Sequence, residues 1–164
     1  MQDFRSLAAG ELEYIVKHTS NHWRKIFNVY AKLLLDWHQV NNRKNLPESW
    51  QKYRDQELFQ SHSQEALIFS HFRLNQNTQA INIIAGKTYA ANVDLPPLVW
   101  LDSYFAINKQ HRLIVAPYPD YRQLSNERIT YADERVEIST TVVPLHNQSN
   151  SGKIHHILIH RVLP

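Results

Sequence analysis

The chain has 164 residues, which suits one domain with a single hydrophobic core. Its composition is 43% apolar and 20% charged, with four tryptophans and only three glycines, so it does not belong to the class of disordered proteins. The absence of cysteine excludes disulfides and thiolate chemistry, and the net charge of +3, spread along the chain, permits an anionic partner without requiring one.

The first residues, MQDFRSLAAGELEY, carry charge early and contain no long apolar block, so we expect no secretory signal. No apolar run approaches the 18 residues or so that a membrane-spanning helix needs. We therefore expect a cytoplasmic protein that does not enter a membrane.

Residues 10–60 are predicted to be helical. Within residues 20–40, aromatic and aliphatic side chains recur in steps of three and four, which is typical of a helix with one wide apolar face. Ser20 or Asn21 is the expected N-cap of this helix. Pro47 is expected to open a further helix, because proline suits the first helical position.

Residues 65–131 are predicted to form the α/β core. Four short apolar runs lie between polar or proline-containing turns, which is typical of strands buried on both faces of a parallel sheet. The runs are ALIF (66–69), AINIIA (80–85), LVWL (98–101) and RLIVAP (112–117). The sequence thus predicts an α/β domain of three layers, with a mainly parallel, short-stranded sheet and N-terminal helices.

Residues 135–164 are predicted to add C-terminal strands. RVEISTTVV alternates apolar and polar residues, HNQSNSG is rich in turn formers, and KIHHILIHRVL is a candidate return strand. We expect an antiparallel hairpin here, within a single domain that spans residues 1–164.

The segment INIIAGKTYA raises the question of a phosphate-binding loop. A P-loop needs a glycine five residues before Gly86, but that position is Ile81, and the residues between are typical of a strand. Two interpretations remain open for Gly86, Lys87 and Thr88. They form either an anion site at a helix N-terminus, on the carboxyl edge of the sheet, or a simple strand-to-helix turn with Lys87 in solvent.

The segment APYPDYRQLSNERI (116–129) also leaves the carboxyl end of a predicted strand and is dense in hydrogen-bonding side chains. Arg122 is suited to bind a phosphate or carboxylate, and the tyrosines offer stacking faces. Asp102 and Asp120 are the candidate catalytic carboxylates, although each is equally suited to cap a turn. The candidate ligand-binding residues are Gly86, Lys87, Thr88, Tyr118, Tyr121, Arg122 and Asn126.

Other kinds of site have little support in the sequence. His156 and His160 have the spacing of a helical zinc site, but on a strand they would lie about 13 Å apart, so we expect no metal. No dinucleotide fingerprint surrounds the three glycines, and we expect no cofactor. His22, Arg24 and Lys25 form either a solvated helix face or a basic rim to the ligand site.

Two blocks, NHWRKIFNVYAKLL and IIAGKTYA…WLD…LIVAPYPDYRQLSN, together resemble an uncharacterised family of bacterial cytoplasmic proteins. More distantly, Gly86–Ala90 and Tyr118-Pro119-Asp120 with Leu124-Ser125 resemble motifs of the uracil-DNA glycosylase-like fold. That resemblance implies a parallel sheet flanked by helices. Tyr118 stands where that family has a histidine, and IFSHF supplies no water-activating Asp or Asn, so the resemblance gives an expectation for the fold and none for glycosylase activity.

The sequence thus predicts a protein that binds an anionic small molecule, a nucleotide or a nucleic-acid end in a pocket at the carboxyl edge of its sheet. Whether it is an enzyme stays open. The alternative is a non-enzymatic interaction or assembly module that uses the aromatic helix 20–40 and the C-terminal strands.

Overall fold

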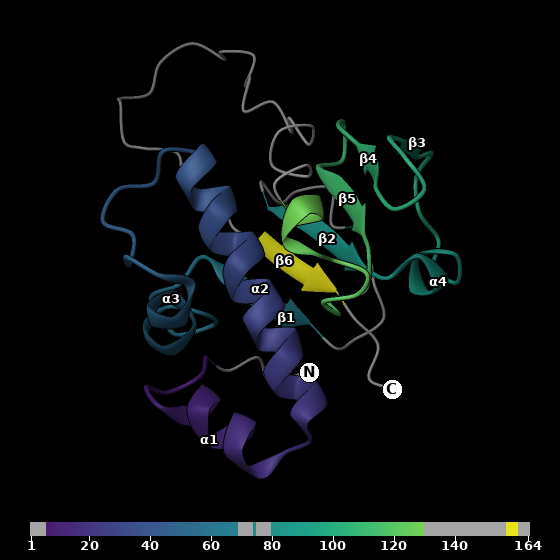
Figure 1. Ribbon diagram of the computed structural model, residues 1–164. Helices are drawn as coiled ribbons and strands as arrows, with labels where there is room; N and C mark the ends of the chain where they lie inside the picture. The colour runs from purple at the N-terminus through teal and green to yellow at the C-terminus, as the bar shows by residue number, and fades with distance from the viewer. Residues whose placement is uncertain (1–5, 69–73, 75–79, 130–156, 161–164) are drawn as a thin grey trace.

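A computed structural model describes residues 6–68, 74, 80–129 and 157–160 (Figure 1). The described helices and strands follow one another in the order α1 (Glu11–His18), α2 (Asn21–Val40), α3 (Trp50–Gln56), β1 (Glu65–Ile68), β2 (Ile81–Ala85), α4 (Lys87–Ala90), β3 (Val99–Trp100), β4 (Ala106–Asn108), β5 (Leu113–Ala116) and β6 (Ile157–His160). The N-terminal helices and the α/β class are therefore confirmed. None of the described helices is long and apolar enough to cross a membrane.

The ends of the three N-terminal helices match the sequence only in part: the prediction that Pro47 opens a helix is wrong, because α3 begins at Trp50, after Ser49. In α1, Glu11 and Glu13 lie in the first turn and Lys17 and His18 in the last, which complements the helix dipole. Ser20 is the N-cap residue of α2, but its side chain makes no capping hydrogen bond. In α3 the Ser49 hydroxyl does cap, accepting from the Lys52 amide at 3.3 Å.

The strands form one mixed sheet in the order β1-β6-β2-β5-β4-β3 (Figure 1). Pairing is parallel between β1, β6, β2 and β5, and antiparallel from β5 to β4 and from β4 to β3. The antiparallel end, including β4, was not predicted. Its cause is the short connection of 109–112 between β4 and β5, because a parallel crossover needs a dozen residues or more.

The C-terminal strand β6 lies inside the sheet. It pairs in parallel with β1 on one side and with β2 on the other, and Ile159 has no exposed surface. The predicted antiparallel hairpin is therefore wrong for Ile157–His160, because both edges of this strand are already occupied. The burial of Ile159 fits this central position in the sheet. The other predicted hairpin strand, in 135–143, lies outside the described residues.

The main core lies between α2 and one face of the sheet (Figure 1). Buried α2 side chains such as Phe27, Tyr30 and Leu34 belong to the same apolar cluster as Ile83 and Ile114. Alternate strand residues point to the other face, where a smaller cluster contains Ile84, Leu113 and Val115 together with residues from α4 and 93–98. Most of the aromatic face of α2 is thus used inside the fold.

Candidate functional site

The carboxyl ends of β2, β5 and β3 lie at one edge of the sheet. Strand β2 is parallel to β5, and two successive antiparallel pairings give β3 the same direction as β5. The residues that follow these three strands are Gly86, Leu101 and Pro117. This topology brings the predicted segments 86–88, 102–104 and 118–126 to the same edge.

Gly86 makes a sharp turn directly after β2. Its φ of 113° and ψ of 123° suit glycine alone, and its amide donates to the Ala116 carbonyl at 2.9 Å. The strand Ile81–Ala85 occupies the positions where a P-loop would wrap a phosphate. Helix α4 has only four residues, so the interpretation as a helix N-terminal anion site has little support, and the turn interpretation fits better.

Lys87 reaches across to strand β3 and the turn after it. Its Nζ lies 4.5 Å from the centre of the Trp100 ring and 3.5 Å from the Ser103 carbonyl oxygen. Trp100 is 44% exposed and Val99 64% exposed, so the prediction of a buried strand at 98–101 is wrong. This strand has two residues and is the last in the order of the described strands, among which it has a neighbour on one side only. Thr88 is exposed beside Lys87.

The two candidate catalytic carboxylates both organise turns. Asp102 Oδ1 accepts from the amides of Tyr104 at 2.6 Å and Phe105 at 2.7 Å. Asp120 Oδ1 accepts from the Arg122 amide at 2.9 Å. These contacts favour the capping interpretation, and a catalytic role for either residue stays a prediction.

Tyr118 joins the strand ends to the start of α2. Its hydroxyl lies 2.8 Å from His22 Nε2, and the two rings are stacked with centres 5.9 Å apart. Its ring also lies beside Gly86, where an added Cβ would be 3.9 Å from Tyr118 Cδ2. The start of α2 was expected to be either a solvated face or a basic rim to the site. The contact with Tyr118 favours the second interpretation for His22.

Cations lie over the other tyrosines at this edge. The Tyr121 ring has Lys25 Nζ at 5.0 Å and the Arg122 guanidinium at 5.6 Å from its centre. The Arg122 Nε also donates to the Tyr121 hydroxyl at 3.2 Å, and this bond, with the nearby charges, raises the pKa of Arg122. The Arg128 guanidinium lies 3.8 Å from the centre of the Tyr104 ring.

We call this set of residues the carboxyl-edge surface; its members are Lys25, Lys87, Trp100, Tyr104, Tyr121, Arg122 and Arg128. Sequence reasoning missed Arg128 and Tyr104, and it placed Trp100 in the core. The predicted residue Asn126 is not one of these members; its side-chain oxygen accepts from Lys32 of α2 at 3.1 Å. The predicted residues are thus brought to one edge, but Lys87, Tyr121 and Arg122 are exposed on it.

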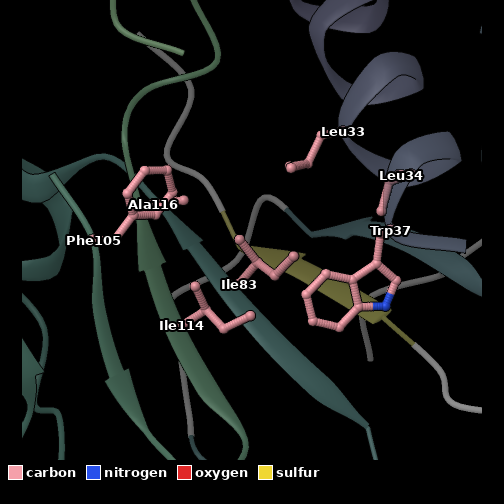
Figure 2. Close-up of a pocket in the computed structure, with 7 residues that line it drawn as sticks. All are labelled: Leu33, Leu34, Trp37, Ile83, Phe105, Ile114 and Ala116. Atoms are coloured by element: carbon pink, nitrogen blue, oxygen red, sulfur yellow. The ribbon is translucent and has the colours of Figure 1, made fainter. Parts of the chain in front are cut away.

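A cavity lies elsewhere, between α2 and the sheet (Figure 2). It has a volume of about 20 Å³ for the centres of water-sized molecules, and every residue around it is apolar. Figure 2 shows the Trp37 indole reaching from α2 toward Ile83 and Ile114 of the sheet. Because no predicted site residue lines this cavity, it does not serve as the predicted polar pocket.

A buried polar cluster joins α2 to β1, and sequence reasoning missed it as well. His38 Nε2 is hydrogen-bonded to Glu65 Oε1, and Arg43 bridges Glu65 to Glu57, with its Nη2 2.9 Å from Glu57 Oε2. Burial opposes ionisation of Glu65, but the hydrogen bonds and charges of its neighbours, His38 first, keep its pKa below the usual value. Burial, and then the charge of Glu65, raise the pKa of Tyr53.

The described residues contain no group of three His, Cys, Asp or Glu side chains that could hold a metal ion. His160 lies on strand β6, as predicted, and His156 lies outside the described residues.

Comparison with protein families gives a match to a family of unknown function (DUF6942) over residues 1–137. No curated protein and no solved structure matches the chain. The prediction of an uncharacterised family is therefore confirmed, and the match extends beyond the blocks on which it was made. The chain belongs to the family of unknown function DUF6942.

Proposed function

We propose that the protein binds an anionic ligand at its carboxyl-edge surface. The observation that carries this proposal is the convergence of four cations from separate parts of the chain. Lys25 comes from α2, Lys87 from α4, and Arg122 and Arg128 from the segment after β5. Such a cluster raises the local concentration of anions and gives several donors for phosphate or carboxylate oxygens.

The surrounding charges favour this interpretation. The part of α2 between Asn21 and Leu35 contains Arg24, Lys25 and Lys32 but no acidic residue. Two acids at the edge, Asp102 and Asp120, each direct one carboxylate oxygen to backbone amides. Those oxygens are therefore less able to compete for the cations.

The experiment is a thermal-shift titration with inorganic phosphate, nucleoside mono- and triphosphates, and dicarboxylates. A ligand at about 100 times its dissociation constant adds about 2.7 kcal/mol to the free energy of unfolding, which is several degrees for a chain of this size. The shift should be lost in a Lys25→Ala/Lys87→Ala variant. A matched control is Lys44→Ala/Lys109→Ala, which removes the same charge from exposed residues that take no part in the carboxyl-edge surface.

Two outcomes would contradict the proposal. One is the absence of a shift with any anion up to millimolar concentration. The other is an equal loss of the shift in the control variant, because binding would then depend on net charge rather than on this surface.

The finer features of the earlier resemblance stay proposals. Tyr118, at the position of the histidine of uracil-DNA glycosylase-like proteins, is hydrogen-bonded to His22, so His22 is a candidate to act in its place. Most of the segment after β1, where a water-activating residue would lie, is outside the described residues. A glycosylase assay on uracil-containing single strands, with His22→Ala as the comparison, would test this directly.

The alternative of an assembly module loses support in its original form. The aromatic face of α2 packs on the sheet, and β6 is enclosed by two neighbours. The rest of the predicted C-terminal strands lies outside the described residues, so this part of the alternative stays a prediction. Sedimentation of the purified protein would test for self-association.

A further inference from the structure

We propose that the anionic ligand is a single-stranded nucleic acid, whose bases stack on the exposed rings of Trp100, Tyr104 and Tyr121. This inference rests on the proposed function above and adds the class of ligand. Its basis is the rings of the carboxyl-edge surface, whereas the proposed function rests on the cations.

The three rings are accessible to a ligand. Trp100 is 44% exposed, Tyr104 41% and Tyr121 49%. Each has a cation near its ring, at 4.5 Å for Trp100, 3.8 Å for Tyr104 and 5.0 Å for Tyr121. Proteins that bind single strands without sequence preference combine the same two elements, a basic track and aromatic stacking platforms.

The three ring–cation pairs are connected into one track. Lys87, which lies over Trp100, also reaches the Ser103 carbonyl next to Tyr104. Arg128, which lies over Tyr104, donates to the carbonyl of Arg122, at 3.2 Å. Strand β3, which carries Trp100, is two strand spacings from β5, or about 10 Å. The track therefore runs from Trp100 of β3 to Tyr121, over which Lys25 of α2 lies.

The number and spread of the rings indicate a polymer with several unpaired bases. One base stacks on one ring, so a mononucleotide would use only a part of the track. In a duplex the faces of the bases are covered by their neighbours, so stacking on protein rings requires a single strand. An acidic peptide would use the cations but would gain little from three aromatic faces.

The experiment is fluorescence anisotropy with labelled oligothymidines of about three and about twelve nucleotides. The longer strand should bind at least tenfold more tightly, and an unlabelled duplex should compete poorly. Trp100→Leu and Tyr121→Leu, which keep apolar bulk but remove the ring, should each weaken binding about fivefold or more. The control is Tyr14→Leu on α1, which removes a ring that is 62% exposed and stacked on His18.

The outcomes separate this inference from the proposed function. If Trp100→Leu and Tyr121→Leu bind like the wild type while Lys25→Ala/Lys87→Ala does not, the anion-binding surface stands and base stacking is overturned. Equal affinity for short and long strands, or for duplex, also overturns it. If no oligonucleotide binds but a small anion does, the ligand class is wrong. Melting temperatures of the variants show whether each is folded, and the two ring variants test the inference independently.

Discussion

Replacing Ile159 with alanine tests whether the C-terminal strand is a central part of the sheet. Ile159 is fully buried and lies in register between Leu67 of β1 and Ile83 of β2. Removing an isoleucine side chain from such a position costs about 2–5 kcal/mol, through lost burial and the cavity that remains. We expect about 3 kcal/mol here, which lowers the melting temperature by roughly 6–12 °C for a chain of this size.

The measurement is thermal and urea denaturation followed by circular dichroism. The control is Val99→Ala in β3, which truncates a side chain that is 64% exposed at the edge of the sheet. That change should alter the free energy of unfolding by no more than about 0.5 kcal/mol. A shift of less than about 2 °C for Ile159→Ala, or one no larger than that of the control, would refute the central position of β6.

Four other predictions concern the turns, the buried cluster and the surface. Gly86→Ala should lower the free energy of unfolding by about 1–3 kcal/mol in a denaturation experiment. There is space for a Cβ, but φ is 113°, which an alanine adopts only with strain; an unchanged free energy of unfolding would disprove this strain. Asp102→Ala should lower the free energy of unfolding by about 1–2 kcal/mol. Asp102→Asn should lower it clearly less, because asparagine keeps an oxygen that accepts both hydrogen bonds of the turn. Equal losses in the two variants would contradict the capping role. The pKa of Glu65 is lowered in the folded protein, so Glu65 contributes stability that is fully present above its unfolded pKa. This stability is lost as pH falls through the lower folded pKa. Glu65→Gln should therefore flatten the acid limb of the curve of stability against pH, and an unchanged limb would contradict this. Lys87→Ala should reduce the slope of log affinity against log salt for an oligothymidine by about 0.7, and an unchanged slope would exclude a phosphate contact at Lys87.

The elements that the sequence predicted well are those with a local signal. The apolar face of α2 repeats over five turns, and β2 and β5 are continuous apolar runs that were located to within a residue at each end. Nothing local in the sequence predicts that β3 is exposed. Val99 and Trp100 are exposed in the structure, yet they are as apolar as the residues of a buried strand. Their exposure follows from the position of β3 at the sheet edge, which depends on the order of strands in space.

The candidate site was predictable in part for the same reason. Segments 86–88 and 118–126 each follow a strand, so the topology of parallel strands was enough to expect them at one edge. The contact of Arg128 with Tyr104 and the burial of His38 with Glu65 join residues that are far apart in the chain. No periodicity or spacing connects such residues, and only the packing of α2 and the turns on the sheet brings them together.

The most direct test of the carboxyl-edge surface is a two-dimensional amide NMR titration of the protein with a short oligothymidine. We expect the indole N–H signal of Trp100 and the amide signals of Lys87, Tyr104, Tyr121 and Arg122 to shift together and to saturate. Signals of Lys44 and Lys109, on other parts of the surface, should stay in place. Shifts centred on those lysines, or no shifts at millimolar concentration, would contradict the account.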